Sequence, residues 1–226
     1  MDFDGAIFLS ALTSPAILRA AVLTVVLTVS SHAIAIVLSL PMAVVLLGKN
    51  RFGRAVTKTY IVLFRAVPLL LLLLLIWNGL PQIDPIFRES WFTPFLAALI
   101  GLSLIEAAYQ VEINRAALGA LDKGQTDAGY ALGLTRLQVL FLIQMPQALR
   151  IALPPTVNEF ITLLKATSIA TVISLRELMT VTQQAVAFSY RYAEYYSAAL
   201  LYYVAMVLAL MAIQSVAERR MLWIGK

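Results

Sequence analysis

The sequence predicts an all-α, polytopic membrane protein, and three observations support this fold class. Of the 226 residues, 61% are hydrophobic and only 13% are charged, whereas a soluble protein carries about 25% charged residues. The mean hydropathy is +0.86. Several apolar runs approach the roughly 20 residues that a helix needs to cross a bilayer core. We therefore expect residues 1–226 to form a single transmembrane domain.

Five apolar segments are predicted to span the membrane. The first is long enough to be tilted or kinked, with Pro41 as the predicted bend. The second contains the run PLLLLLLLIW, which begins at Pro68. The five segments cover about residues 16–47, 60–79, 92–112, 156–175 and 195–217.

The basic residues of the connections predict the orientation. Segments 49–58 and 113–155 and the C-terminal tail hold eleven Lys and Arg residues, against three in segments 81–91 and 176–194. Because basic residues in short connections stay in the cytoplasm, we expect the N-terminus outside and the C-terminus inside. Four tyrosines at the predicted outer start of the last segment fit an interfacial aromatic belt; they are Tyr190, Tyr192, Tyr195 and Tyr196.

Composition also limits the kinds of site. The chain has no cysteine, which excludes disulfides, thiolate metal sites and thiol nucleophiles, and we predict neither a metal site nor a catalytic residue. The net charge of +5 is spread over separate connections, whereas nucleic-acid binding needs a basic face. The start of the chain has two acids and no base, so we expect it to be retained rather than cleaved as a signal peptide. The single histidine, His32, lies in SSHAIAIVL, where a packed, hydrogen-bonded imidazole is favoured over a ligand or a proton relay.

Residues 125–155 are too polar to span a membrane and too apolar for an ordinary loop. A short helix is predicted to begin near Gln125 or Thr126 and to hold Asp127 in its first turn, where the helix dipole favours an acid. Gly133 is the predicted C-terminal stop of this helix.

A second short helix is predicted to follow. Thr135 and Gln138 have the spacing of a capping box at its start. Pro146 should disturb this helix, and Pro154 with Pro155 should end it before the fourth span.

Small residues mark the first of these helices. Ala128, Gly129 and Gly133 remove side-chain bulk, so that the backbone of another protein could come close. A re-entrant or interfacial helix without a partner is the alternative.

The same residues carry a family resemblance. Asp127-Ala128-Gly129, Gly133, Ile143 and Met145-Pro146 have the spacings of the Glu-Ala-Ala loop and resemble that loop in binding-protein-dependent ABC importer permeases. Asp127, Gly129 and Met145 differ from the pattern, which has Glu, Ala and Leu there. The glycine costs about 1 kcal/mol of helix stability relative to alanine.

Five ordered motifs extend the resemblance over most of the chain. They narrow it to the polar amino acid permeases of the histidine, glutamine, glutamate and arginine type. The last motif lacks the acid that the family pattern has between Lys and Thr. The motifs are Phe64-Arg65-Ala66-Val67-Pro68; Ala108-Tyr109-Gln110-Val111-Glu112-Ile113-Asn114-Arg115-Ala116; Gly124-Gln125-Thr126-Asp127-Ala128 with Ala131-Leu132-Gly133; Met145-Pro146-Gln147-Ala148-Leu149-Arg150 with Leu153-Pro154-Pro155; and Leu164-Lys165-Ala166-Thr167-Ser168-Ile169.

The resemblance implies a five-span permease subunit of the type I importer fold in the cell inner membrane. Such a subunit works as a homo- or heterodimer, with a second permease copy or a paralogue. Its partners are a cytoplasmic ABC ATPase dimer, which binds ATP and Mg, an extracytoplasmic amino-acid-binding protein, and membrane lipid. The chain has no G-x-x-x-x-G-K-[ST] motif, so the ATPase is expected on a separate subunit and no cofactor in this chain. The residues implied to dock the ATPase, within the 113–155 coupling loop, are Gln125, Thr126, Asp127, Ala128, Gly129, Ala131, Leu132 and Gly133.

Ionisable residues in the spans are the candidates for a substrate path, because charges inside a bilayer are costly. Glu106 lies deepest, and a carboxylate there could meet the ammonium group of an amino acid. The alternative is a structural pair of Glu106 with Lys165 or Arg65. Other residues are predicted to line the path or to form intramembrane charge pairs: Lys165, Thr167 and Ser168 for the path, and Arg65, Glu112 and Glu159 for the pairs.

Two other classes of function compete. A stand-alone secondary transporter or channel for small polar solutes would normally show internal repeats, and the five unequal segments show none. A membrane enzyme would need nucleophiles or metal-spaced acids that the sequence lacks.

Overall fold

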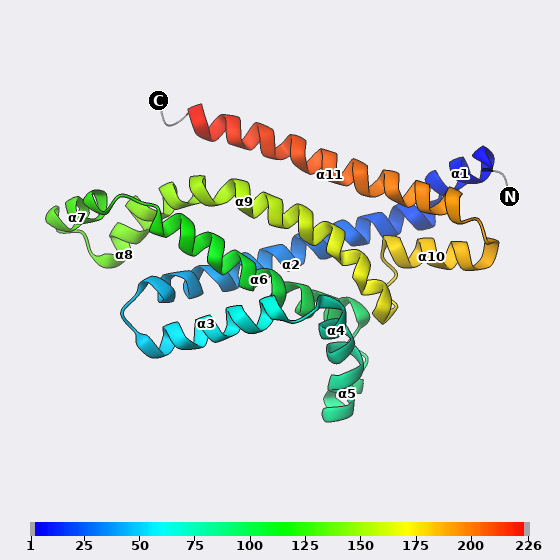
Figure 1. The fold of residues 1–226 in the computed structure, drawn as a ribbon, viewed down its shortest axis with the longest axis horizontal. Helices are drawn as coiled ribbons and strands as arrows, with labels where there is room; N and C mark the ends of the chain where they lie inside the picture. The colour runs from blue at the N-terminus through cyan, green and yellow to red at the C-terminus, as the bar shows by residue number, and fades with distance from the viewer. Residues whose placement is uncertain (1–2, 224–226) are drawn as a thin grey trace.

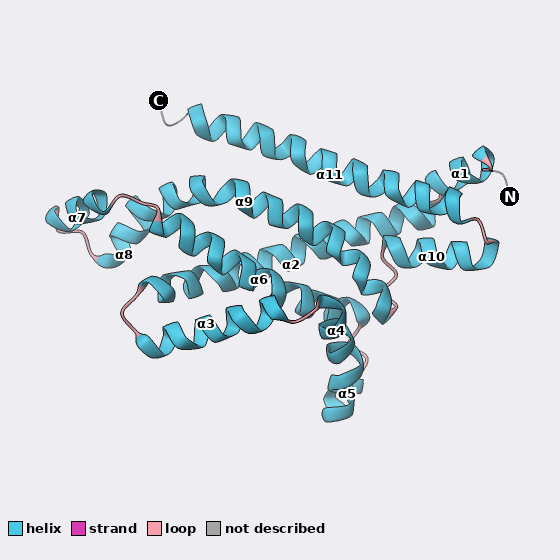
Figure 2. Cartoon of the chain, in the orientation of Figure 1, coloured by secondary structure: helices cyan, strands magenta, loops and turns pink. Residues whose placement is uncertain are grey.

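In the computed structural model the chain is a bundle of long helices (Figure 1), and the described residues, 3–223, contain no strand (Figure 2). The all-α prediction is confirmed. The elements are α1 (Gly5–Leu12), α2 (Pro15–Leu47), α3 (Arg51–Ala66), α4 (Leu69–Leu74), η1 (Leu75–Gly79), α5 (Leu80–Ile83), η2 (Pro85–Arg88), α6 (Pro94–Gly119), α7 (Lys123–Ala131), α8 (Arg136–Gln138), η3 (Val139–Gln144), α9 (Met145–Ala166), η4 (Thr167–Ile173), α10 (Leu178–Ser189) and α11 (Tyr192–Trp223).

Candidate spans overlap the five predicted segments, with two differences: one span is bent, and the stretch Arg136–Ile173 begins well before residue 156, where the fourth span was predicted to start. Four continuous helical stretches in the described chain are long and apolar enough to cross a membrane: Pro15–Leu47, Pro94–Gly119, Arg136–Ile173 and Tyr192–Val216. A fifth candidate is the pair Arg51–Ala66 and Leu69–Ile83, which is bent by 100°.

The predicted second span, 60–79, is therefore broken rather than straight. Val67 and Pro68 both adopt extended backbone angles, with ψ of 127° and 129°. The ring of a proline disfavours the helical conformation for the residue before it. For this reason α3 ends at Ala66, and α4 to α5 lead away from the bundle (Figure 1).

The prolines inside the long helices correct one expectation. Pro41 lies inside α2, which continues to Leu47, as the predicted span did, whereas Pro154 and Pro155 lie inside α9 instead of ending a module. Prolines inside membrane helices are tolerated because neighbouring helices and side chains satisfy the freed carbonyls. The disturbance expected at Pro146 is present, since the π-helix η3 directly precedes the regular turns of α9.

Small residues let the central helices pack closely. Ala35 and Ala43 of α2, and Ala97 and Ala107 of α6, are fully buried. At Gly101 of α6 an added Cβ would lie 2.7 Å from Leu73 Cδ2. Membrane helices associate mainly through such close packing, because lipid gives little hydrophobic drive between them.

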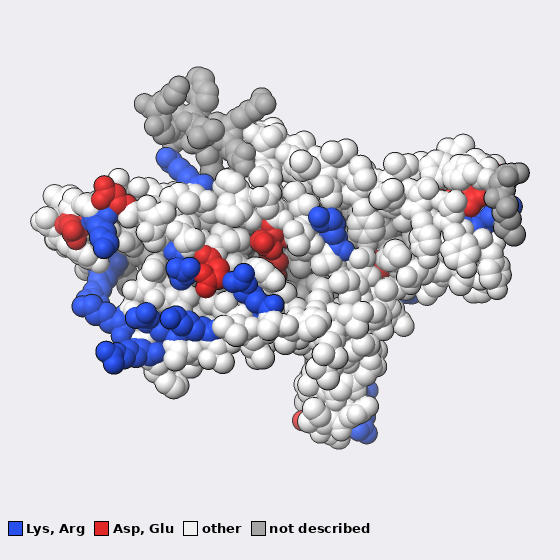
Figure 3. Space-filling view, viewed as in Figure 1, with Lys and Arg blue, Asp and Glu red and all other residues white. Residues whose placement is uncertain are grey.

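The two ends of the bundle differ in charge. The α2–α3 connection, α7 and the C-terminal end of α11 lie at one end, and α1 and α10 lie at the other (Figure 1). Lys and Arg side chains gather over α3 and near α7 (Figure 3). The two basic connections within the described chain, 49–58 and 113–155, thus share one end of the molecule.

Candidate functional site

The first candidate site is the connecting segment, residues 120–144. It holds α7, which lies between two candidate spans, and α8 with η3, which form the start of the stretch Arg136–Ile173. Asp122 is the N-cap of α7, and its Oδ1 accepts a hydrogen bond of 2.8 Å from the Gly124 N–H. Asp127 is not in the first turn, as the sequence suggested, because the helix already begins at Lys123. Asp122, and not Asp127 as predicted, therefore lies beside the free N–H groups at the start of α7.

Both predicted helix boundaries after α7 are confirmed. Gly133 has φ of +79°, a left-handed conformation that glycine adopts without strain, and it follows the end of α7. Thr135 and Gln138 form the capping box that opens α8, with both reciprocal hydrogen bonds present.

Gly129 serves the packing of the connecting segment. It is buried, and an added Cβ would lie 2.7 Å from Ile143 Cδ1 and 3.1 Å from Val139 Cγ2. The sequence suggested that this glycine clears space for another protein, but the space is taken by η3 of the same chain. The departure from alanine in the family pattern thus has an internal cause.

Two side-chain hydrogen bonds tie α7 to the start of α9. Gln144 Nε2 donates to Thr126 Oγ1 over 3.1 Å, and Gln147 Nε2 donates to Gln125 Oε1. Gln125 and Thr126 therefore bind within the chain. Apart from buried Gly129, the remaining predicted docking residues are exposed and available to a partner, and Leu132 is 82% exposed; they are Asp127, Ala128, Ala131, Leu132 and Gly133.

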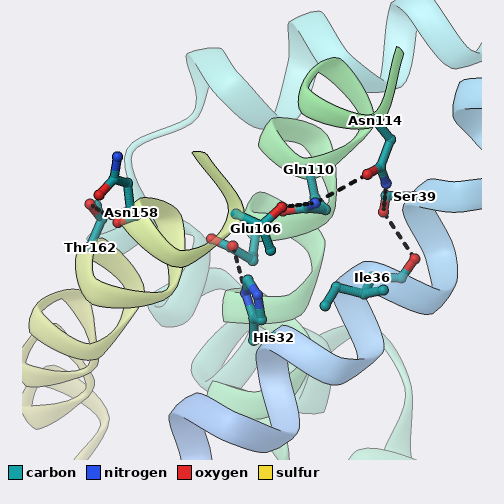
Figure 4. Close-up of polar contacts among 9 residues, drawn as sticks. His32, Ile36, Ser39, Glu106, Gln110, Asn114, Asn158 and Thr162 are labelled. Carbon is teal, nitrogen blue, oxygen red and sulfur yellow. Dashed lines mark hydrogen bonds and ion pairs between the residues drawn. The ribbon is translucent and has the colours of Figure 1, made fainter. Parts of the chain in front are cut away.

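The second candidate site is a buried pair in the middle of the bundle. His32 Nδ1 of α2 lies 2.9 Å from Glu106 Oε1 of α6 (Figure 4), and the two residues are only 7% and 3% exposed. The rings of Phe160, from α9, and His32 meet in a T-shaped arrangement at a centroid distance of 5.0 Å. The hydrogen-bonded, packed histidine predicted from the sequence is confirmed, and its partner is Glu106.

The sequence suggested Lys165 or Arg65 as the structural partner of Glu106, but the structure pairs Glu106 with His32 instead. Lys165 is exposed, and the Arg65 guanidinium lies 5.0 Å above the ring of Tyr109. A buried carboxylate needs a partner close at hand, and His32 supplies one at the interface of α2 and α6.

A line of polar side chains continues from Glu106 along α6. Gln110 and Asn114 follow at intervals of four residues, so that all three lie on one face of the helix (Figure 4). Asn114 Nδ2 donates to Ser39 Oγ over 2.9 Å, and Gln110 Nε2 donates to Thr156 Oγ1 over 2.8 Å. The line therefore joins α2, α6 and α9.

Sequence reasoning missed this polar line. The spacing of four between Glu106, Gln110 and Asn114 in an apolar segment was the available signal. Gln110 Oε1 is buried without a hydrogen-bond partner in the described structure.

The other predicted residues form no hydrogen bond with the buried pair, although Glu159 lies close enough to interact electrostatically with Glu106 and His32. Glu112 binds Arg115 of its own helix at 2.7 Å, and Glu159 is half-buried on α9 with no ion pair among the described residues. The hydroxyls of Thr167 and Ser168 donate to the backbone carbonyls of Leu164 and Lys165. No group of three or more metal-ligating side chains occurs in the described part of the chain.

A span broken at Pro68, a short exposed helix between two spans and a buried polar interface are consistent with a membrane-embedded transport subunit. The chain belongs to the family of binding-protein-dependent transport system inner membrane components, whose model matches residues 35–223.

Relatives and solved structures agree with this family. The chain is 37% identical over 207 residues to the probable amino-acid permease protein YxeN of Bacillus subtilis, covering 92% of each chain. It is 36% identical to the arginine transport system permease protein ArtQ of Bacillus subtilis, covering 92% of this chain and 93% of the relative.

Among solved structures, a chain of an amino acid ABC transporter crystallised with histidines matches with a TM-score of 0.84 and 32% identity, covering 97% of this chain and 100% of that chain. A chain of the inward-facing MetNI methionine ABC transporter matches with a TM-score of 0.76 at 20% identity, covering 91% and 95%. The latter likeness concerns the fold alone.

Proposed function

We propose that this chain is the permease subunit of an ATP-driven ABC importer for polar amino acids. The carrying observation is the connecting segment, whose short helix α7 is exposed on one face and tied to a candidate span on the other. The names of the relatives that match most of the chain support amino acids as the substrate class.

The assembly that this function requires has several parts. The exposed face of α7, with Asp127, Ala128, Ala131 and Leu132, would dock in a cytoplasmic ABC ATPase dimer that binds ATP and Mg. A second permease copy or a paralogue would complete the pathway, and an amino-acid-binding protein would deliver substrate from outside. In this proposal residues 1–226 form one domain with five spans, counting the bent pair as one, and residues 113–155 include the cytoplasmic coupling loop. The N-terminus lies outside and the C-terminus lies in the cytoplasm.

ATP binding by the partner ATPase would supply the energy for transport. If ATP binds the ATPase dimer more tightly in one state than in the other, it shifts the equilibrium between inward- and outward-facing bundles. The docked α7 would then move with the ATPase, and its side-chain bonds to Gln144 and Gln147 would carry that movement to α9.

The buried pair supplies a place for substrate recognition. Glu106 would exchange the His32 imidazole for the ammonium group of the amino acid when the bundle opens, because a carboxylate binds either donor by a charge-assisted hydrogen bond. Lys165, Thr167 and Ser168 would line the path further along. Glu106→Gln should reduce uptake into vesicles that contain the complete complex; unchanged apparent affinity and rate would exclude this role.

The subunit function is tested by reconstitution. The chain should co-purify with a P-loop ATPase, and amino acid with its receptor should stimulate ATP hydrolysis. Leu132→Glu places a charge on the exposed face of α7 and should weaken the ATPase interaction, whereas Arg88→Gln, in η2 away from that face, should not. A chain that transports amino acids without any ATPase would instead be a secondary transporter.

A further inference from the structure

A groove opens between the ends of α2 and α6 and the connecting segment, with a volume of about 470 Å³. Val44, Leu47 and Leu118 form apolar walls, and Lys49 and Arg136 bring two positive charges to it. The groove lies at the end of the bundle where the basic side chains gather (Figure 3).

Neither cation of the groove is neutralised within the described chain. Lys49 and Arg136 are exposed, and neither takes part in the ion pairs of residues 3–223. The sequence contains no Asp or Glu between Asp4 and Asp84. The N-terminus of α3, which begins directly after the groove at Arg51, adds a partial positive charge.

The basic surface continues along α3 beside exposed apolar residues. Arg51, Arg54 and Lys58 are exposed, while Phe52 is 79% and Val56 is 54% exposed. A helix with basic and exposed apolar side chains is suited to the membrane–water interface, where it meets anionic lipids.

We propose that this groove binds an anionic phospholipid, with Lys49 and Arg136 at the phosphate and an acyl chain against Val44 and Leu47. Val44 and Leu47 are 38% and 51% exposed at the end of a candidate span, so a ligand that is only an anion would leave them uncovered. Basic pockets between membrane helices suit the headgroups of acidic lipids. This site goes beyond the transport proposal and requires only that the chain sits in a bilayer.

The test uses the purified transporter complex in nanodiscs that contain phosphatidylglycerol or phosphatidylcholine, with bound lipid measured by native mass spectrometry. The wild type should retain phosphatidylglycerol in preference to phosphatidylcholine. Lys49→Gln/Arg136→Gln should weaken that retention about 30-fold, because each basic residue at an anionic surface contributes a factor of about five. The charge-matched control Arg88→Gln/Arg176→Gln, whose residues do not line the groove, should behave as the wild type.

A second variant tests the apolar wall with the charges kept. Val44→Trp fills the groove and should also reduce phosphatidylglycerol retention, while inorganic phosphate at millimolar concentration should not displace the lipid. Equal retention of both lipids by the wild type, unchanged retention in both groove variants, or displacement by free phosphate would overturn the proposal. Crosslinks from position 49 to the ATPase that compete with lipid would assign the groove to that protein instead. Lipid retention is measured without a transport assay. Its outcome is therefore independent of whether the proposed transport function is correct.

Discussion

His32 of α2 and Glu106 of α6 are 74 positions apart in the sequence and form a buried pair at 2.9 Å. Their contact ties the two central helices together, because both side chains are buried and each is hydrogen-bonded to the other. Phe160 extends the contact to α9.

Removing one member of this pair should cost more than removing both. His32→Leu leaves a buried carboxylate without a partner and should lower the free energy of unfolding by about 3–5 kcal/mol, whereas His32→Leu/Glu106→Leu should recover most of it. Thermal unfolding of the purified complex measures both. Glu112→Gln, which breaks the exposed pair with Arg115, is the matched control and should cost about 1 kcal/mol or less. A His32→Leu variant as stable as this control would contradict the assignment.

The packing of Gly129 predicts a specific rescue. Gly129→Ala places a Cβ 2.7 Å from Ile143 Cδ1, and such overpacking costs about 1–3 kcal/mol, against a gain of about 1 kcal/mol in helix propensity. Gly129→Ala/Ile143→Val removes the clashing methyl group and should restore both stability and ATPase stimulation. If the double variant is no better than Gly129→Ala alone, the glycine serves a partner surface instead.

The two aspartates of the connecting segment should differ in their effect on α7. Asp122→Ala removes the N-cap and should destabilise the helix by about 1 kcal/mol, seen as faster amide hydrogen exchange over residues 123–131. Asp127→Asn should leave this exchange unchanged, since Asp127 caps nothing in the structure. Faster exchange in Asp127→Asn than in Asp122→Ala would mean that Asp127, and not Asp122, caps the helix.

Glu177, which lies outside the candidate spans, should make the stability of the chain depend on pH. Burial raises the pKa of this carboxyl group above its ordinary value, although hydrogen bonds from the N–H groups of Met179 and Thr180 lower it in part. The folded chain thus holds this proton more tightly than the unfolded chain. The resulting stability is fully present below the unfolded pKa of 4.5 and is lost as the pH rises through the folded value.

Glu177→Gln cannot titrate and should not lose stability in this way. The difference in unfolding temperature between wild type and Glu177→Gln should therefore shift in favour of the variant as the pH rises from 4.5 toward 7. Glu89→Gln, at an exposed position, is the control. A pH-independent difference would mean that Glu177 has the same affinity for its proton in both states.

Local signals in the sequence predicted local structure well. The capping box of Thr135 and Gln138, the stop at Gly133 and the burial of His32 each depend on neighbours within a few residues or on the apolar run around them. Four of the predicted spans coincide with continuous helices for the same reason.

Relations between distant residues could not be predicted in this way. The partner of His32 depends on the register between α2 and α6, and the role of Gly129 depends on Ile143 folding back over α7. The capping role of Asp122 depends on where α6 ends, which no single motif specifies. The family resemblance predicted that residues 127–133 dock a partner protein, but it did not predict the contacts of this segment within the chain.

The attachment of α7 to the first residues of α9 has a geometric result. From Met145 to Phe160 the backbone is a continuous helix, and fifteen residues of helix extend about 22 Å. The helix is continuous although Pro154 and Pro155 lie within it, so a displacement of its end beside α7 is passed along α9 toward the Phe160 ring that packs against His32. A protein that binds the exposed face of α7 would thereby act on the buried histidine about 22 Å away.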